Sequence, residues 1–252
     1  MKNIFLKIHK HKEIIFYIMI LAGVFTAACC KENEPKTGSN QITLLTESPV
    51  VFISLGGNGV VAIDWGDKTL IDTVTLRDSW IEMQSYHHFY TDASTLHSIA
   101  IFGDGITGFS CSGTAITKLD VSKNPVLELL TCSFNLLISL DVSHNTRLRM
   151  LDCNGNLLYN LDVSQNTELI TLNLNRNQIT KLNLGSNIML QNLMCRSNQL
   201  TSDALNEMFG TLHDNIITGI IKELNINYNP GTNECDMSIA EKKGWIFGDR
   251  VM

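Results

Sequence analysis

The sequence has little of what would place it in a common catalytic class. Proline occurs four times in 252 residues, and aromatic residues make up 7% of the chain. It contains no nucleophile elbow, no His-Glu-x-x-His zinc helix and no Cys-x-x-Cys pair. The sequence therefore predicts a protein that is not an enzyme and that binds no cofactor and no metal.

Positive charge is also scarce. The chain has 19 Lys and Arg against 25 Asp and Glu, which gives a net charge of −6. Binding to nucleic acid depends on neutralising phosphates, and adhesion to anionic lipid depends on a basic face. The composition therefore argues against a nucleic-acid partner and against attraction to a membrane by charge.

The N-terminus has the pattern of a secretory signal. A start with four lysines is followed by an apolar run from Ile14 to Ala28. A membrane-spanning helix needs about 20 apolar residues, whereas the core of a signal peptide has about 7–15. The run is too short for a membrane-spanning helix and fits the upper end of the range for a signal-peptide core. We predict that residues 1–28 form a signal peptide, with an uncleaved anchor helix as the alternative.

Two cysteines close this run. The stretch TAACCKENEP resembles the lipobox of bacterial lipoproteins, in which the cysteine after the cut receives diacylglycerol. Cys29 is the expected lipidation site and Cys30 the alternative, although Thr26 stands where that family usually has leucine. The resemblance implies an outer-membrane protein that is held by its lipid anchor only and faces outward.

The polar residues 29–40 are expected to form a flexible tether between the anchor and the folded part. Removal of residues 1–28 takes away four lysines and Glu13. The remaining chain has 15 basic and 24 acidic side chains, a net charge of −9. The predicted mature protein is therefore more acidic than the full chain.

A repeat with a constant interval between its copies fills most of the second half. One half-motif begins at residues 130, 151, 172 and 193 as LTCSFN, LDCNGN, LNLNRN and LMCRSN. The other begins at residues 119, 140, 161 and 182 as LDVSKN, LDVSHN, LDVSQN and LNLGSN. A degenerate copy, FSCSGT, begins at residue 109, and LNINYN begins at residue 224 after an insertion of ten residues.

This pattern resembles the leucine-rich repeat LxxLxLxxN/CxL. It predicts a mainly β protein, in which residues 108–252 form a leucine-rich-repeat solenoid with a short helical C-terminal cap. One coil buries too little apolar surface to offset the entropy of ordering its backbone, so neighbouring coils must stack in register. Residues from Ser202 onward are expected to form a helix, and a short helix and a strand near Trp245 are expected to close the solenoid.

Residues 41–107 contain short apolar runs typical of β-strands, and GGNG at residues 56–59 predicts a hairpin turn between two of them. DWGDKT at residues 64–69 and HHFY at residues 87–90 resemble elements of PKD-like β-sandwich domains. Lys68 replaces a glycine of that family. The resemblance implies a small sandwich-like β domain that caps the start of the repeats.

Three columns of the repeat have structural interpretations. Because Leu174 stands in the cysteine column, we predict buried thiols that pack as small apolar groups, and disulfides between coils are the alternative. The asparagines are expected to satisfy backbone groups at the turns. The predicted structural ladder is Cys111, Cys132, Cys153, Cys195, Asn135, Asn156, Asn177 and Asn198. A third column, Asp120, Asp141 and Asp162, is expected to form turns with nearby serines, and calcium binding there is left open.

Side chains between the inward positions of each short strand point outward and differ from coil to coil. A rigid sheet with mixed polar and apolar groups suits a protein partner. The predicted partner-binding face consists of Leu129, Thr131, Arg149, Met150, Asp152, Thr171, Asn173, Arg176, Asn192, Met194 and Arg196.

The resemblance to leucine-rich-repeat surface lipoproteins also implies a protein partner, from a host or from the cell envelope. A glycan-binding accessory lipoprotein is the first alternative, although the repeat faces have few aromatic residues for stacking on sugars. A structural spacer of the envelope is the second.

Overall fold

The computed structural model describes residues 40–92, 95–216 and 219–248. The expected signal peptide, Cys29, Cys30 and the tether up to residue 39 lie outside these residues. The described part is mainly β and forms a β-solenoid of about nine turns, which confirms the predicted fold class. Within it, no helix is long and apolar enough to cross a membrane.

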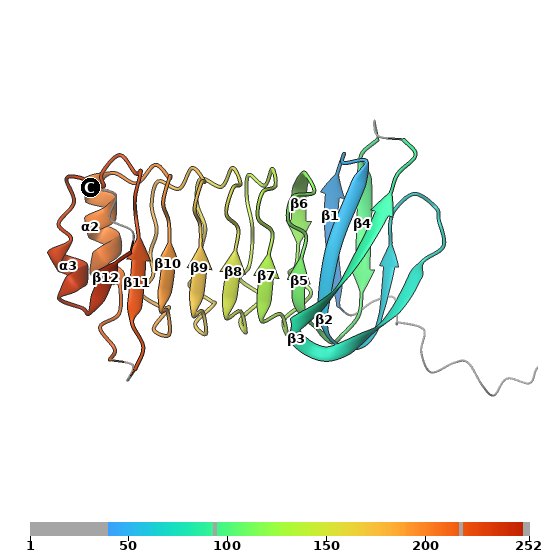
Figure 1. Ribbon diagram of the computed structural model, residues 1–252, viewed down its shortest axis with the longest axis horizontal. Coiled ribbons are helices and arrows are strands. Elements are labelled where there is room, and N and C mark those ends of the chain that lie inside the picture. The colour runs from blue at the N-terminus through green and yellow to red at the C-terminus, as the bar shows by residue number, and fades with distance from the viewer. Residues whose placement is uncertain (1–39, 93–94, 217–218, 249–252) are drawn as a thin grey trace, which may run out of the picture. The chain divides into compact units, whose positions relative to one another are not determined.

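Twelve strands of the described part belong to one sheet, in the order β12-β11-β10-β9-β8-β7-β5-β2-β4-β1-β6, with β3 paired to β2 (Figure 1). The N-terminal strands are β1 (Gln41–Thr46), β2 (Val50–Asp64), β3 (Asp72–Phe89) and β4 (His97–Phe102). The remaining strands are β5 (Ile106–Ser110), β6 (Ile116–Asp120), β7 (Leu129–Thr131), β8 (Met150–Asp152), β9 (Thr171–Asn173), β10 (Asn192–Met194), β11 (Lys222–Asn225) and β12 (Trp245–Phe247).

The N-terminal β part is built on the long antiparallel pair β2 and β3. The predicted hairpin turn at GGNG is wrong, because these glycines lie inside β2, where the pairing with β3 shifts register at Gly57. Gly57 has φ +130°, and a Cβ atom there would collide with the carbonyl oxygen of Gly105. Glycine therefore permits a bulge and a close backbone contact rather than a chain reversal.

The strands of the repeat stack in parallel and in register. Leu130 lies opposite Leu151, which lies opposite Leu172, and the row continues through Leu193 to Leu224. All five leucines are at most 1% exposed. The predicted stacking of the coils is therefore confirmed, and their apolar side chains form one continuous core with those of the N-terminal strands.

The N-terminal strands and the repeat share this sheet without a break. The expected domain boundary at residue 107 falls inside β5, which pairs antiparallel with β2 on one side and parallel with β7 on the other. β6 then pairs antiparallel with β1. The first coil is thus bonded to the N-terminal strands along both β5 and β6.

The C-terminal cap consists of α2 (Ser202–Thr211), α3 (Ser238–Glu241) and β12. The side chain of Thr201 caps α2 by accepting a hydrogen bond from the backbone N–H of Ala204 at 3.3 Å. The helix buries one face, formed by Ala204, Leu205, Met208 and Phe209. The helix predicted after Ser202 is confirmed, and it covers the apolar end of the core.

Two lysines hold the end of α2 in this cap. Lys243 Nζ donates hydrogen bonds of 2.6 Å to the carbonyl oxygens of Gly210 and Leu212. Lys222, which is only 5% exposed, donates to the carbonyl oxygens of Lys243 at 2.6 Å and of His213 at 3.3 Å. Positive charge at a helix C-terminus is favourable, and these bonds satisfy carbonyl groups that the helix leaves free.

Candidate partner-binding face

The outward side chains of β7 to β11 form two rows, which we call the ladder face. The first row is Leu129, Met150, Thr171, Asn192 and Glu223, and the second row is Thr131, Asp152, Asn173, Met194 and Asn225. Each strand presents one residue to each row, and no two neighbouring strands present the same pair. The inward positions, by contrast, hold leucine or another small apolar group in every coil.

Leu129 does not belong to the exposed part of this face. The sequence predicted an outward position, but the side chain is buried, with 8% of its surface exposed. Leu129 lies opposite Gly108 of β5, and β5 contacts β3 of the N-terminal strands. The N-terminal strands therefore cover the first coil, and the exposed ladder face begins at Thr131 and Met150.

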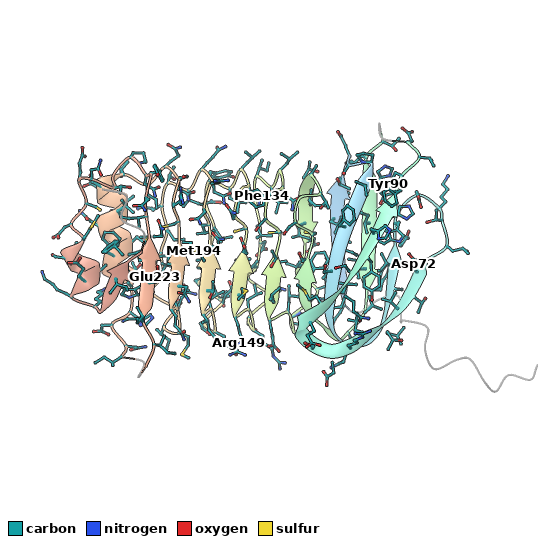
Figure 2. The ribbon with its side chains drawn as sticks, viewed as in Figure 1. Asp72, Tyr90, Phe134, Arg149, Met194 and Glu223 are labelled. Atoms are coloured by element: carbon teal, nitrogen blue, oxygen red, sulfur yellow. The ribbon has the colours of Figure 1, made fainter. Side chains whose placement is uncertain are left out.

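The other predicted face residues lie on the ladder face or on its rims. Met150 is exposed, and Thr131, Asp152, Thr171, Asn173, Asn192 and Met194 are half-buried. Figure 2 shows Met194 on the strands and Arg149 at their lower end. Arg176 is exposed in an upper turn, with φ +53°. Arg196 is half-buried, and its guanidinium lies 4.8 Å from the centre of the Tyr228 ring.

The ladder face is hollowed near its C-terminal end. A depression of about 340 Å³ is lined by Thr171, Asn192, Leu193, Met194, Glu223 and Asn225. Three of these residues belong to the predicted face, and Glu223 and Asn225 extend it by one strand. The depression offers two amides, a carboxylate and a thioether on a rigid base.

A second depression runs along the lower rim of the strands. Its volume is about 720 Å³, and it is lined by Glu128, Arg147, Arg149, Glu168, Ile170 and Met189. Charges of both signs alternate here between adjacent coils. The lower rim therefore offers ion-pairing groups beside the less charged ladder face.

Sequence reasoning missed Glu223, Asn225 and Tyr228, although the signal was present. The insertion of ten residues moves the next copy, LNINYN, from the expected phase, but its first leucine still lies opposite Leu193. Counting outward positions from that leucine gives Glu223 and Asn225. Tyr228 occupies the position that Phe134 holds in LTCSFN.

The upper turn of each coil uses a residue in the left-handed region. Phe134, Arg176, Ser197 and Tyr228 have φ between +53° and +61°, and Gly113 and Gly155 take the same position in their coils with φ +70° and +68°. Non-glycine residues in this region are strained by roughly 1–2 kcal/mol each. Phe134, labelled at the upper edge of Figure 2, lies over Gly155, where a Cβ atom would come within 2.8 Å of its ring.

The cysteine column is buried between the coils. Cys111, Cys132, Cys153 and Cys195 are all 0% exposed and form no disulfide. Burial raises the pKa of the Cys111 and Cys195 thiols to about 12 and raises the pKa of Cys132 and Cys153 as well. Neutral thiols packed against leucine are poor nucleophiles and poor metal ligands.

The asparagine columns tie each coil to the one before it. Asn156 Nδ2 donates to the carbonyl oxygens of Cys132 at 2.9 Å and Cys153 at 3.0 Å, and its Oδ1 accepts the N–H of Leu137 at 3.0 Å. Asn135, Asn177 and Asn198 make equivalent bonds in their coils. These side chains complete the hydrogen bonding of turns that are closed to water.

The aspartate column (Asp120, Asp141 and Asp162) lies on the back of the solenoid, which is the side of the coils opposite the ladder face. Its carboxylates shape the lower turns. In each coil, Oδ1 of Asp120, Asp141 or Asp162 accepts the N–H of the serine two residues later at 2.9 Å. Hydrogen bonds from the serine side chain and backbone hold the pKa of each carboxyl group below its ordinary value. In the described ranges, no three His, Cys, Asp or Glu side chains come together in a way that could hold a metal ion.

The residues of the WGD and HHFY stretches pack together in the N-terminal part. His88 Nε2 lies 2.7 Å from Asp67 Oδ2, and its ring stacks on Trp65 with centroids 5.0 Å apart. Tyr90 donates a hydrogen bond to the carbonyl oxygen of Trp65 at 2.7 Å and stacks on His97. These contacts join the loop after β2 to the ends of β3 and β4, which gives the residues a structural role.

Comparison with known proteins gives structural neighbours and no family. No protein-family model and no curated protein matches the chain. The functional domain of InlJ from Listeria monocytogenes, described as including a cysteine ladder, is similar with 36% identity, a TM-score of 0.39 and coverage of 54% of this chain and 33% of that one. An internalin, InlF, from Listeria monocytogenes strain 4b F2365 is similar with 14% identity, a TM-score of 0.39 and coverage of 56% and 46%. The chain thus spans about a third of the first neighbour and less than half of the second.

Proposed function

We propose that the chain is a non-enzymatic, lipid-anchored surface protein that binds a protein partner through its ladder face. The observation that carries the proposal is the contrast between the two sides of the same strands. The inward positions repeat from coil to coil, whereas the outward positions change between thioether, hydroxyl, amide and carboxylate. Packing requires the first pattern, but nothing in the packing requires the second.

The dimensions of the face suit a protein partner when its rims are included. The strands β7 to β11, which carry the ladder face, span four spacings of about 4.8 Å, or about 19 Å. A stable protein interface buries roughly 800 Å² on each partner, which corresponds to a patch about 28 Å across. Each strand is only three or four residues long, so the upper and lower rims must also contribute.

The upper rim provides the strongest candidate for a binding hot spot. Tyr228 is 58% exposed, and the guanidinium of Arg196 stacks on its ring. Tyrosine and arginine carry much of the binding energy in protein interfaces because they offer a large contact area with few torsions to order. The stacking holds both side chains in place before a partner arrives.

Affinity enrichment from host and envelope extracts, with the full chain in detergent micelles, tests the proposal. Met194→Arg combined with Glu223→Arg blocks the depression on the ladder face, and exposed Thr180→Arg on the back is the matched control. We expect a protein that is captured by the wild type and the control and is lost with the double variant. Equal capture by all three chains, or capture of no protein, contradicts the proposal.

The aromatic pair on the upper rim permits a finer test. Tyr228→Ala is expected to weaken the captured complex about tenfold or more, since truncation of a hot-spot residue costs more than about 1.4 kcal/mol. Tyr159→Ala, which truncates another exposed tyrosine of the repeat, is the control and should leave the affinity within about twofold.

The anchor and the location belong to the same proposal and are supported by the sequence of residues 1–31. Incorporation of labelled palmitate at Cys29 or Cys30, and processing that globomycin blocks, would support lipidation. Protease shaving of whole cells would release the repeat if it faces outward. Loss of label only in a double Cys29→Ala, Cys30→Ala variant, but not in either single variant, would show that both thiols can serve.

One observation favours glycan binding as a second candidate function. Phe52 and Phe89 are 51% and 65% exposed on the paired strands β2 and β3, and the ring of His87 lies between them at 5.9 Å and 5.3 Å. Exposed rings can stack on sugars. Binding of the chain to a polysaccharide array, lost in Phe52→Ala, would favour this function over the first if no protein is enriched.

A further inference from the structure

The long strand β3 pairs with a neighbouring strand on one edge only. It has 18 residues, and its partner in the sheet is β2 (Figure 1). The two strands at the ends of the sheet order are much shorter, with three residues in β12 and five in β6. The second edge of β3 is therefore the longest strand edge in the described part of the chain that no other strand covers.

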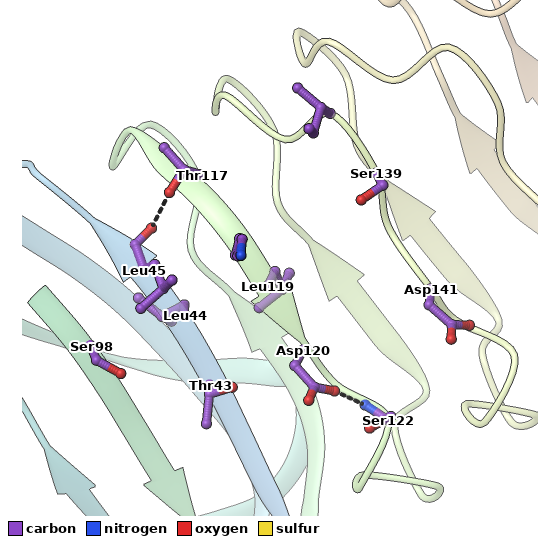
Figure 3. Close-up of a pocket in the computed structure, with 12 residues that line it drawn as sticks. Thr43, Leu44, Leu45, Ser98, Thr117, Leu119, Asp120, Ser122, Ser139 and Asp141 are labelled. Carbon is purple, nitrogen blue, oxygen red and sulfur yellow. Dashed lines mark hydrogen bonds between the residues drawn. The ribbon is translucent and has the colours of Figure 1, made fainter. Parts of the chain in front are cut away.

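The end strand β6 differs, because the next coil covers its second edge. Figure 3 shows that coil beside β6. The N–H of Ile116 donates to Asn135 Oδ1, and the carbonyl oxygen of Val121 accepts from Asn145 Nδ2, each at 2.9 Å. The coil is thus bonded on both sides of residues 117–120, and a further strand cannot reach β6.

The pairing with β2 determines which backbone groups of β3 face away from the sheet. The N–H of Tyr90 donates to the carbonyl oxygen of Pro49 at 2.9 Å and continues the register of the antiparallel pair. Bonded positions alternate along such a pair, so the N–H and C=O groups of Ser85, His87 and Phe89 point away from β2. In the described ranges, these groups form no hydrogen bond on that side, and all three residues are exposed.

The middle of β3 satisfies its own backbone, whereas the end does not. The N–H of Arg77 donates to Gln84 Oε1 at 3.2 Å, and the N–H of Glu82 donates to Ser79 Oγ at 2.9 Å. Natural edge strands are usually protected from further pairing by charge, proline, a bulge or a covering segment. Residues 85–89 read SYHHF and contain no lysine, no acidic residue and no proline. We call these five residues the open edge.

The outer face beside the open edge is aromatic. Phe89 and Phe52 are 65% and 51% exposed, and Phe52 lies opposite His87 in the pair of strands. The His87 ring lies 5.9 Å from the Phe52 ring and 5.3 Å from the Phe89 ring. A strand added to the open edge would place alternate side chains beside these rings, where β-branched or aromatic residues pack best.

The charge of the N-terminal part favours a basic partner over a second copy of the chain. Residues 41–107 contain eight acidic and two basic side chains. Asp78 and Glu82 are exposed on β3 just before the open edge. Two such acidic surfaces would repel each other, whereas lysine or arginine beside the added strand would be attracted.

We propose that the open edge takes an extended segment of a partner protein, which adds as a strand, has apolar residues at alternate positions and is flanked by lysine or arginine. The five residues of the open edge span about 17 Å. The outward row of Thr131 continues through Ser110 and Ser54 to Ser85, so the added strand extends the same sheet. The proposal does not depend on binding at the ladder face.

A synthetic peptide tests the proposal with the full chain in detergent micelles. The probe is fluorescein-labelled Lys-Val-Thr-Val-Thr-Val-Thr-Lys, which has lysine at both ends because the strand can add in either direction. Fluorescence anisotropy should show saturable binding at low salt, and replacement of both lysines by glutamate should weaken it about threefold or more.

Two methylated peptides distinguish strand addition from contact through side chains. One has N-methyl groups on the three valines and the other on the three threonines. In a strand, alternate N–H groups face the same edge, so one of these peptides loses every donor to β3 and the other loses none. One should bind at least tenfold more weakly than the probe and the other within about threefold. Equal binding of the two overturns the proposal.

Variants of the chain locate the site. His87→Pro removes an N–H that faces away from β2 and fills the approach to it with the proline ring, so binding should weaken at least tenfold. Circular dichroism checks that this variant is folded. Phe89→Ala removes an exposed ring beside the added strand and should weaken binding about two- to fivefold. Phe134→Ala, which truncates an exposed phenylalanine of the repeat, is the matched control and should leave binding unchanged.

Amide hydrogen exchange resolved to single residues shows where the peptide lies. Bound peptide should slow the exchange of Ser85, His87 and Phe89 and leave β8 to β10 unchanged. Absence of peptide binding, or binding unchanged in both His87→Pro and Phe89→Ala, overturns the proposal. Binding of the chain to a polysaccharide array without binding to the peptide also overturns it and assigns the rings to a glycan. The ladder-face proposal is tested by separate variants and is unaffected by these results.

Discussion

Replacement of Asn156 by alanine should destabilise the protein by an amount that its hydrogen bonds allow us to work out. The side chain is 5% exposed and makes three bonds to the backbone. Alanine leaves the N–H of Leu137 buried without an acceptor, which costs about 1–3 kcal/mol. The carbonyl oxygens of Cys132 and Cys153 keep a second donor each, from Asn135 and Asn177.

The loss at those two carbonyl groups is therefore only the net value of a hydrogen bond, about 0.5–1.5 kcal/mol each. The total is a loss of about 2–6 kcal/mol in the free energy of unfolding. Urea unfolding followed by circular dichroism measures it, with Asn160→Ala as the control, because Asn160 is exposed in the same coil. The control should change stability by less than about 0.5 kcal/mol. A loss below about 1 kcal/mol for Asn156→Ala would refute the role that we assign to the asparagine column.

Three further predictions concern thiols, pH and the upper turns. At pH 8, iodoacetamide should modify half-buried Cys235 faster than the four buried thiols of the cysteine column, which should react only when the protein unfolds. Peptide mass spectrometry measures the modification of each cysteine. Fast reaction of Cys132 in the folded protein would contradict the prediction. Burial, together with nearby Lys222 and Lys243, lowers the pKa of His213, so the unfolded chain binds the proton more readily and stability should fall as pH drops below about 6.5. His213→Gln should reduce the loss of unfolding free energy between pH 7.5 and 5.5, and the exposed control His144→Gln should not. An equal pH dependence of unfolding in both variants would contradict this role of His213. Ser197→Gly should raise the free energy of unfolding by about 0.5–1 kcal/mol, because Ser197 has φ +56° and glycine adopts this conformation without strain. The control Gln178→Gly, at an exposed position, should lower the free energy of unfolding. A decrease for Ser197→Gly as well would show that the turn is not strained.

The sequence predicts the solenoid well because each coil repeats the requirements of its neighbours. Leu130 and Leu151 must face the core if either does, since the side chains of adjacent coils share that core. The constant interval between copies therefore determines register as well as fold. The helix after Ser202 could be predicted for a similar reason, because its apolar residues recur on one face.

Features that depend on non-repeating neighbours could not be read from the pattern. Leu129 occupies an outward position in its strand, but the adjacent N-terminal strands cover it. GGNG has the composition of a hairpin turn, yet β3 pairs with β2 on both sides of it. Lys222 is charged, and its burial is explained by the carbonyl groups of His213 and Lys243, to which its ammonium group donates.

The candidate binding site was predictable to the extent that it follows the period. Thr131, Asp152, Asn173 and Met194 form one row because they share a position in successive coils. Tyr228 lies beyond the insertion, and its contact with Arg196 brings together residues from coils of unequal length.

X-ray diffraction from crystals of the chain provides the most direct test of the stacked coils. Our account predicts that the Cα atoms of Leu130, Leu151, Leu172 and Leu193 lie in one row with about 4.8 Å between neighbours. A slip of one residue in any of these pairs would turn the outward rows toward the core. Such a slip, or leucines separated into different layers, would contradict the ladder face and every binding role assigned to it.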